Sequence, residues 1–424
     1  MIISKLALRN FRGIHDLDVN LNKQLNVICG INGVGKSSIL DAIAIQLSWI
    51  VARIRTGKSP GRPISEHDVK NDEPYSKTEL FIKDDGYSYS GKLVKYKKGR
   101  LGDEKSSMID FSNCAKRIRQ EITDNENTSI PVFIYYSTNR VVNDIPLRIR
   151  GKHEFNLLET YDGSLESGVN FRSFFEWYRN REDLENENFR EMTKEIKSSQ
   201  YNPSSFNDKQ LETVRKAISS ISGFSGISVN RNPLRMEVSK NGEKLRVDQL
   251  SDGEKCLLAM AGDLARRLSI ANPSLSNPLE GEGIVLIDEI DLHLHPQWQK
   301  KIILKLMQTF SNIQFIVSTH SPQVLSEVEG NNIYSLYLDK QKNISCYKPD
   351  QAIGLTSSEI LEILMETNSI NELVKREIDE IFNLIDTDKF IIAKDYIAAF
   401  IKKYGSVPDI SRAEALITMY SDVE

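Results

Sequence analysis

The segment GINGVGKS at residues 30–37 combines three glycines, a lysine and a serine at a spacing that can bind phosphate. It fits the pattern GxxxxGK[ST] of phosphate-binding loops. Apolar residues at 25–29 and 39–43 predict a strand before the loop and a helix after it, which is the context such a loop requires. The glycines let the chain curl so that backbone amides converge on one anion at the start of the helix.

The side chains of this phosphate loop (residues 30–37) indicate separate roles. Lys36 is predicted to reach the β- and γ-phosphates of a nucleotide, and the hydroxyl of Ser37 is predicted to bind magnesium. The remaining predicted nucleotide contacts are Asn32, Gly33, Gly35 and Ser38. A glycine-rich turn that binds nothing is the alternative, but the flanking strand and helix disfavour it.

Two adjacent acids follow a second apolar run. Residues 284–287 have the composition of a buried parallel strand, and Asp288 and Glu289 come directly after them. Asp288 is predicted to hold the magnesium, usually through water, and Glu289 to polarise the water that attacks the γ-phosphate. The alternative is a strand that stops at a solvated acidic turn.

A histidine follows a third apolar run. Residues 313–317 again read as a buried strand, and the segment STHSP comes next, with the histidine at His320. Ligands of open α/β sheets bind at the carboxyl ends of the strands, so His320 is predicted to lie at the site as a catalytic residue. A core or capping histidine is the alternative.

The segment LSDGE at residues 250–254, called the signature below, opens a helix predicted to run through residue 268. It follows a predicted hairpin, residues 230–247, that turns at Asn241-Gly242. Ser251 and Glu254 form a capping box, and this structural role is one complete interpretation. The functional interpretation adds an anion at the exposed amides around Gly253, namely the γ-phosphate held by another subunit.

The order of these motifs resembles that of the ATP-binding cassette ATPases, whose signature reads LSGGQ where this chain has LSDGE. The resemblance implies that the ligands are ATP and magnesium (Mg2+), and that two chains form a homodimer that sandwiches two ATP molecules. Each signature then closes the other chain's phosphate loop through Ser251, Gly253 and Glu254. The segment 289–296, with Asp291, is implied to hold the loop that crosses the dimer interface.

The segment LRNFRG at residues 8–13 resembles the opening of the branch that contains the SMC proteins, the related break-repair ATPases and RecF. In those relatives the basic positions contact nucleotide, and the resemblance carries this role to Arg9 and Arg12. Exposed arginines on an edge strand are the alternative. The chain departs from the family after a predicted strand at 131–136, where no glutamine follows; Asn139 or Ser137 is expected to substitute at the magnesium.

Composition indicates a soluble protein. The chain has 424 residues, of which 40% are hydrophobic and 27% charged, and no run approaches the roughly 18 apolar residues of a membrane helix. Its start runs into a strand rather than a signal sequence, and four scattered cysteines favour a reducing cytoplasm. We therefore expect a cytoplasmic protein that contacts no membrane.

Charge bears on nucleic-acid binding. A net charge of −4 disfavours nonspecific DNA affinity of the whole surface. A predicted hairpin at 78–96, turning at Asp85-Gly86, leads into a basic segment with interleaved tyrosines. Its basic residues are Lys92, Lys95, Lys97, Lys98 and Arg100, beside Tyr87, Tyr89 and Tyr96. DNA binding is one interpretation, and lysines that protect a sheet edge are the other.

The motifs together predict an α/β fold: a two-lobed ABC-ATPase head of the P-loop NTPase type, with a helical insertion and a helical C-terminal tail. Residues 1–140 are expected to form lobe I, 141–229 the insertion, 230–348 lobe II, and 349–424 a tail that binds a partner. No sustained heptads occur between the phosphate loop and the signature, so long coiled-coil arms are not expected.

Compact size and a helical tail resemble the ATPase subunit of Septu-type anti-phage systems. That resemblance implies a partnership with a separate HNH nuclease, in a homodimer or a higher oligomer. A nuclease site within this chain is not expected, because the tail lacks the strand and acid pattern of a Toprim metal domain. A RecF-like DNA-binding ATPase of repair is the alternative.

Overall fold

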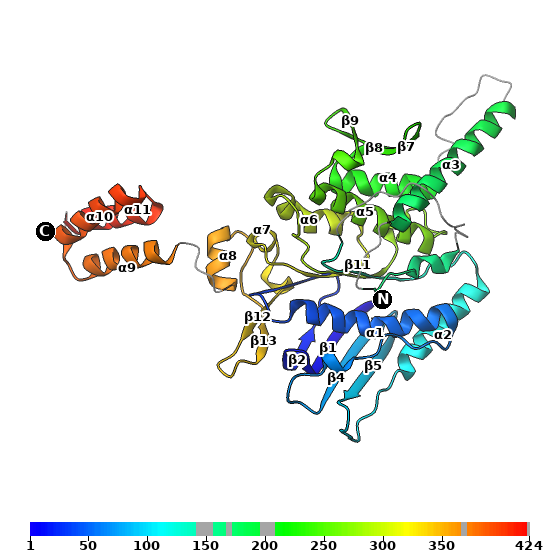
Figure 1. Ribbon diagram of the computed structural model, residues 1–424, viewed down its shortest axis with the longest axis horizontal. Coiled ribbons are helices and arrows are strands. Elements are labelled where there is room, and N and C mark those ends of the chain that lie inside the picture. Colours follow the sequence, from blue (N-terminus) through cyan, green and yellow to red (C-terminus); the bar gives the residue numbers. More distant parts are fainter. Residues whose placement is uncertain (141–155, 167–171, 196–207, 366–370, 422–424) are drawn as a thin grey trace. The chain divides into compact units, whose positions relative to one another are not determined.

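The computed structural model describes residues 1–140, 156–166, 172–195, 208–365 and 371–421 (Figure 1). Its contacts divide the chain into two compact units, Met1–Ile360 and Leu361–Glu424. The division lies after Ile360, rather than near residue 349 where the tail was expected to begin. Parts of the predicted insertion, residues 141–155, 167–171 and 196–207, lie outside the described residues.

A six-stranded sheet forms the centre of the first unit, with the order β13-β12-β3-β11-β10-β6. Its strands are β3 (Leu25–Gly30), β6 (Val132–Tyr136), β10 (Gly283–Ile287), β11 (Ile313–Ser318), β12 (Ile333–Leu338) and β13 (Ile344–Tyr347). The first five run parallel, and β13 is antiparallel to β12. Every residue of β3, β6, β10 and β11 is buried, which explains their continuous apolar runs.

Helices cover both faces of this sheet. α1 (Lys36–Thr56) packs on one face, and α5 (Asp252–Ala271) lies on the other with α4 (Lys209–Ser222) and α6 (Pro296–Thr309) (Figure 1). Among the described residues α1 alone has the length and composition to cross a membrane, but 61% of that stretch is buried within the fold. Core helices of soluble proteins share this property, so we assign α1 to the core.

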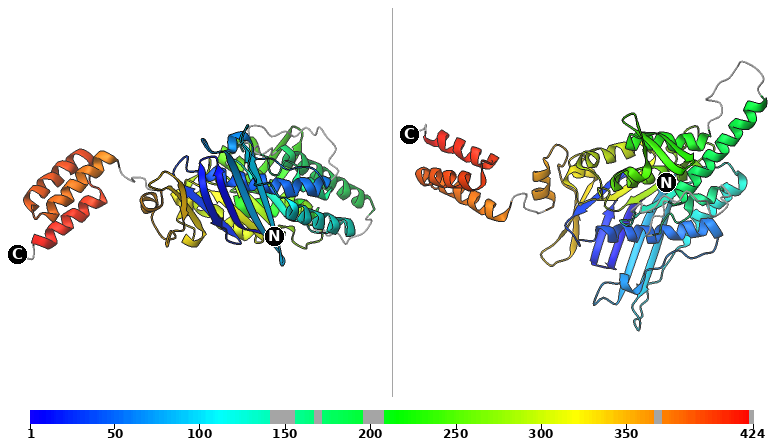
Figure 2. Two further views of the ribbon diagram at one scale, coloured as in Figure 1. Left: turned by 90° about the horizontal axis from the view of Figure 1, so that it is seen from below. Right: turned by 45° about the horizontal axis from the view of Figure 1, so that its top comes forward.

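Sheet A, an antiparallel sheet within residues 1–140, has the order β2-β1-β4-β5. Its strands are β1 (Ile2–Phe11), β2 (Ile14–Asn20), β4 (Tyr75–Asp84) and β5 (Tyr87–Tyr96), and Figure 2 shows them side by side. The hairpin turn at Asp85-Gly86 is confirmed, with positive φ at both residues. α2 (Ile109–Asp124) packs against β5 and α1.

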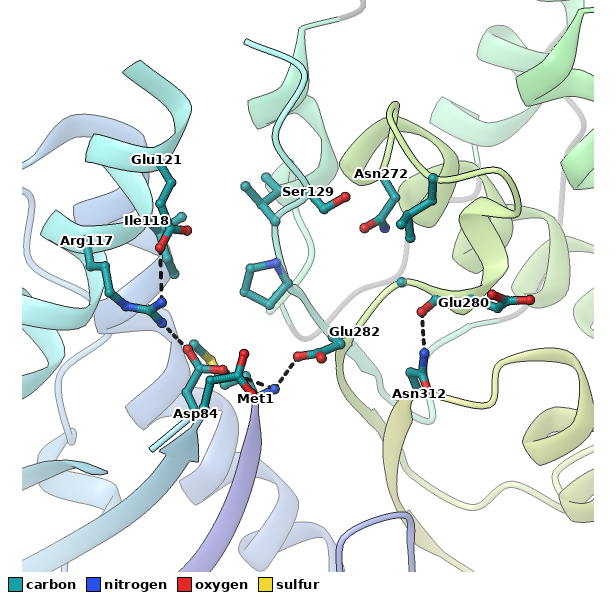
Figure 3. Close-up of a pocket in the computed structure, with 15 residues that line it drawn as sticks. Met1, Asp84, Arg117, Ile118, Glu121, Ser129, Asn272, Glu280, Glu282 and Asn312 are labelled. Carbon is teal, nitrogen blue, oxygen red and sulfur yellow. Dashed lines mark hydrogen bonds and ion pairs between the residues drawn. The ribbon is translucent and has the colours of Figure 1, made fainter. Parts of the chain in front are cut away.

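Two polar contacts join sheet A to the central sheet. The amine of Met1 lies 2.5 Å from Glu282, just before β10, and 3.2 Å from Asp84 at the end of β4 (Figure 3). The side-chain amide of Gln314, on β11, exchanges hydrogen bonds of 2.7 and 2.8 Å with the backbone of Ile3. The first strand is therefore fixed to the strands that end at the predicted catalytic residues.

The middle of the chain forms a smaller α+β part. α3 (Arg172–Glu195) and α4 pack with a three-stranded sheet of β7 (Ser225–Arg231), β8 (Leu234–Lys240) and β9 (Glu243–Arg246). The predicted turn at Asn241-Gly242 is confirmed between β8 and β9. β7 was not predicted, and it begins at Ser225, inside the range expected to be a helical insertion.

The end of the chain is helical, as predicted. α8 (Ser357–Leu364) begins at a capping box, in which the hydroxyl of Thr356 donates to Glu359 at 2.8 Å. α9 (Glu372–Asp386), α10 (Phe390–Tyr404) and α11 (Pro408–Ser421) then form a unit with its own core. That core contains Ile378, Ile381, Ile385, Ala393, Ile397, Phe400, Ile410, Ala413 and Ile417.

Candidate nucleotide-binding site

Three of the predicted motifs meet at one edge of the central sheet. The phosphate loop follows β3, Asp288 and Glu289 follow β10, and His320 follows β11, which lies between those two strands. Because parallel strands end at the same edge, chain segments far apart in the sequence come together there.

The phosphate loop has the geometry that its glycines predict. Gly30, Gly33 and Gly35 have φ angles of 139°, 80° and 93°, in the region that favours glycine. A β-carbon at Gly30 would also overlap the backbone oxygen of Leu336. No side chain caps the start of α1 at Gly35, so its first amides are available to an anion.

Lys36 is buried at the centre of the site. Its Nζ donates hydrogen bonds of 2.9 Å to the carbonyl oxygens of Gly30 and Ile31, within the loop itself. Burial is the largest influence and lowers the Lys36 pKa, whereas nearby acids raise it. These acids include Asp288, Glu289 and Asp291, so the lysine faces the acidic turn after β10.

Ser318, at the end of β11, holds the turn after β10. Its hydroxyl donates to Oδ1 of Asp288 at 2.5 Å and accepts a hydrogen bond from the backbone N–H of Glu289 at 2.7 Å. Glu289 has a φ of 48°, a conformation that is uncommon for glutamate. The sequence analysis missed Ser318, although it lies two residues before His320.

The loop around His320 is tied to Asp291. The Thr319 hydroxyl donates to Oδ1 of Asp291 at 2.5 Å, and the backbone N–H of His320 lies 3.4 Å from the same oxygen. Burial and the charge of Lys36 lower the His320 pKa, and the neighbouring acids only partly oppose this. The imidazole is therefore neutral at pH 7.

Ser137 and Asn139, the expected substitutes for the missing glutamine, lie just after β6. Ser137 is buried and Asn139 is exposed. Arg140, which the sequence analysis did not assign, is 2% exposed and reaches the turn after β10. Its guanidinium donates to the carbonyl oxygens of Ser137 at 3.1 Å, of Glu289 at 2.5 Å, and of Asp288.

The signature caps α5 as predicted. The backbone N–H of Ser251 donates to Glu254 at 3.0 Å, and Lys240 forms an ion pair of 2.6 Å with the same carboxylate. Burial raises the Glu254 pKa, but Lys240 and Ser251 outweigh this and the net pKa is lowered. No hydrogen bond or ion pair among the described residues joins 251–254 to the phosphate loop of this chain.

The two predicted arginines lie in different surroundings. Arg9 forms cross-strand ion pairs with Asp16 and Asp18 at 2.8 and 2.7 Å. Its strand, β1, lies between β2 and β4, so the edge-strand alternative is wrong. Arg12 reaches Asp41 of α1 at 2.6 Å, and α1 is the helix that follows the phosphate loop.

The tyrosines of the basic hairpin pack within the protein. Tyr89 is buried and accepts a hydrogen bond from Arg117, and the Tyr96 ring lies 5.7 Å from that of Tyr75. The backbone of Ser107 forms a bridge with Lys92 that covers part of the free edge of β5. Tyr87 stacks on Tyr89 with 6.2 Å between the ring centres, so each of the three rings already has an aromatic partner, which favours the edge-protection interpretation.

The side-chain oxygens at the site can hold magnesium only together with the phosphate oxygens of a nucleotide. Within the described ranges no three His, Cys, Asp or Glu side chains are grouped to hold a metal ion. Ser37, exposed at the start of α1, and Asp288 supply oxygen, the element that magnesium prefers. Such a site needs phosphate oxygens to complete it.

Comparisons with known proteins also indicate an ATPase. The profile of the family described as "AAA domain, putative AbiEii toxin, Type IV TA system" matches residues 25–326. The chain is 31% identical to a Retron Ec83 probable ATPase of Escherichia coli, over 92% of this chain and 81% of that protein. It is 34% identical to a Retron Vc95 probable ATPase of Vibrio cholerae, over 73% and 68%. It is 24% identical to a Septu protein PtuA of Bacillus thuringiensis, over 88% and 85%.

Proposed function

The chain belongs to the family of AAA domains described as putative AbiEii toxin, Type IV TA system, and from this premise we propose that it is an ATP-hydrolysing subunit of a bacterial anti-phage defence complex. The ATPase part rests on one observation, the placement of Lys36, Glu289 and His320 at one sheet edge. The predicted kinship with Septu ATPases is confirmed, and the retron ATPases match at higher identity. Both kinds of relative support the defence role.

Nucleotide binding follows from the phosphate loop. The amides at the start of α1 and the Lys36 amine bind the phosphates, with Asn32, Gly33, Gly35 and Ser38 around them. Ser37 and Asp288 would hold magnesium, which would neutralise phosphate charge. Lys36 exchanges its two bonds to loop carbonyls for bonds to the nucleotide.

Hydrolysis follows from the acidic turn. The Glu289 carboxylate orients a water and accepts its proton as the water oxygen attacks the γ-phosphorus. The bond from the γ-phosphorus to the bridging oxygen breaks, and ADP leaves with that oxygen. Neutral His320 donates a hydrogen bond to the γ-phosphate. Ser318 fixes the Glu289 backbone, so the carboxylate needs little reorganisation.

The signature acts on a second copy of the chain. Ser251 is exposed, and its hydrogen bonds lie within the cap of α5 rather than at its own phosphate loop. A homodimer with two shared sites gives the start of α5 an anion to bind. Asp291 and the loop 289–296 then line the contact between the chains. A higher oligomer is compatible with the same contact.

A separate HNH nuclease is the proposed partner of the tail. Ile397 and Phe400 are buried in the tail's own core and do not face a partner. Other large apolar side chains of the tail are exposed: Leu373, Ile391, Ile392, Tyr396, Met419 and Tyr420. The nuclease binds this second set, which we call the exposed apolar set.

A RecF-like repair role needs a DNA-binding surface, and the packing of Tyr89 and Tyr96 leaves the basic hairpin a poor stacking platform. All four cysteines are free thiols, which fits a reducing cytoplasm. We therefore place the protein in cytoplasmic defence rather than in repair.

Phage challenge of cells that carry the native locus tests the proposal. Lys36→Ala is expected to abolish protection against a phage that the wild-type locus restricts. Lys23→Ala, which removes an exposed lysine, is the matched control and is expected to keep protection. Equal protection by both variants would show that defence does not require ATP binding at the phosphate loop. Sensitivity to DNA damage in a deletion strain, with phage resistance unchanged, would favour repair.

A further inference from the structure

Arg140 is a buried cation that joins two chain segments. It follows β6, and its guanidinium donates to carbonyl oxygens on its own segment and on the turn after β10. The partners on that turn are Asp288 and Glu289, which lie 148 and 149 positions away in the chain.

The contacts fix the catalytic turn from both sides. Glu289 has a positive φ, and such a conformation persists only where its surroundings hold it. Ser318 binds the N–H of Glu289, and Arg140 binds its carbonyl oxygen. The direction of the Glu289 side chain depends on this backbone conformation, so both contacts determine where the carboxylate points.

Arginine suits this position because its planar fork offers five donors, whereas lysine or glutamine cannot reach all these acceptors at once.

We propose that Arg140 is a positioning residue for hydrolysis, which holds the Glu289 turn in its left-handed conformation. The inference rests on the proposed ATPase function and adds a residue that keeps the water-activating carboxylate directed at the γ-phosphate.

Steady-state kinetics of the full-length chain test the positioning role. Arg140→Lys keeps the charge but loses the fork, and we expect kcat to fall about 100-fold while KM for ATP changes less than about threefold. Arg140→Ala is expected to behave alike and to regain part of its kcat on addition of guanidinium chloride at millimolar concentration. Arg267→Lys, at a buried arginine paired with Asp263, is the control and is expected to keep both constants.

Wild-type kcat in both Arg140 variants would overturn the inference, and so would a raised KM with unchanged kcat, which would make Arg140 a nucleotide-binding residue. Absence of ATPase activity in the wild-type chain would instead contradict the proposed function.

Discussion

Gly253 lies so close to the backbone of His293 that a β-carbon at residue 253 would overlap the His293 carbonyl oxygen. The contact joins the first turn of α5 to the loop 289–296. A backbone carbonyl cannot swing away as the end of a flexible side chain can, so the signature and this loop move together. The two segments implied to face the other chain are therefore one rigid surface.

Gly253→Ala is expected to displace the signature from this loop. Because the substitution leaves the phosphate loop untouched, ATP binding to one chain should persist while hydrolysis falls about tenfold or more. Gly242→Ala is the control, since a β-carbon there meets nothing within 4 Å and costs about 1 kcal/mol through its positive φ alone. Equal ATPase rates in the two variants would show that the contact has no catalytic role.

Lys36→Ala and Glu289→Gln should separate binding from chemistry. Removing the Lys36 amine takes the main cation from the phosphates, so ATP affinity should fall by at least about tenfold. Glu289→Gln removes only the carboxylate that activates water, so it should keep ATP and trap a dimer. Nucleotide titration and size measurement with ATP and magnesium check this. Equal loss of affinity in both variants would contradict the roles assigned.

A mixture of two inactive chains tests the shared site. In a heterodimer of Lys36→Ala and Ser251→Arg chains, one composite site has an intact phosphate loop and an intact signature. We expect up to about half of the wild-type rate per heterodimer, because one of two symmetric sites survives. If heterodimers form but no activity returns, each chain hydrolyses ATP alone.

The sequence could predict features that follow a repeating pattern or a fixed spacing. The phosphate loop, β10 with Asp288, and the cap of α5 are of this kind, because each depends on neighbours in the chain. Arg140 could not be predicted in this way. Its acceptors lie 148 and 149 positions away and become neighbours only because β6 pairs with β10.

Amphipathic helices show a related limit. The apolar residues of α10 recur at helical spacing, which predicts a buried face but does not indicate what covers it. Ile397 and Phe400 pack within the three-helix unit instead of facing a partner. The residues left exposed, such as Ile391, break the periodic pattern and gave no signal.

The pH dependence of hydrolysis should reveal His320. Its pKa lies below the ordinary 6.5, so the imidazole stays neutral as the pH falls to 6.5 and gains its proton only below that. Activity that requires neutral His320 should therefore persist at pH 6.5 and decline under more acid conditions. His320→Gln should hydrolyse ATP more slowly than the wild type. Its rate should not decline at acid pH, because glutamine does not titrate. An inflection above pH 6.5 would contradict the assignment.

Partner capture should depend on the tail as a whole. Deleting 366–424 removes the three-helix unit and should leave ATP binding intact, because that unit has a separate core. Truncation at Asp409 is a poorer test, since it takes Ile410, Ala413 and Ile417 out of the core and unfolds what remains.

Within the intact tail, Ile391→Glu places a charge on the exposed apolar set, where Ile391 is 82% exposed. It should reduce capture of a co-expressed HNH nuclease at least about tenfold without changing the melting temperature. Lys402→Glu, which alters an exposed residue of the same helix, is the control. Full capture by Ile391→Glu and by the deletion would show that the interface lies outside the tail, for example on α3.

The separate core of the tail also has an evolutionary consequence. A module that does not rely on its host for packing can be lost, gained or replaced by recombination without damage to the ATPase. Substitutions can then change the surface of the tail while the nucleotide-binding residues stay the same.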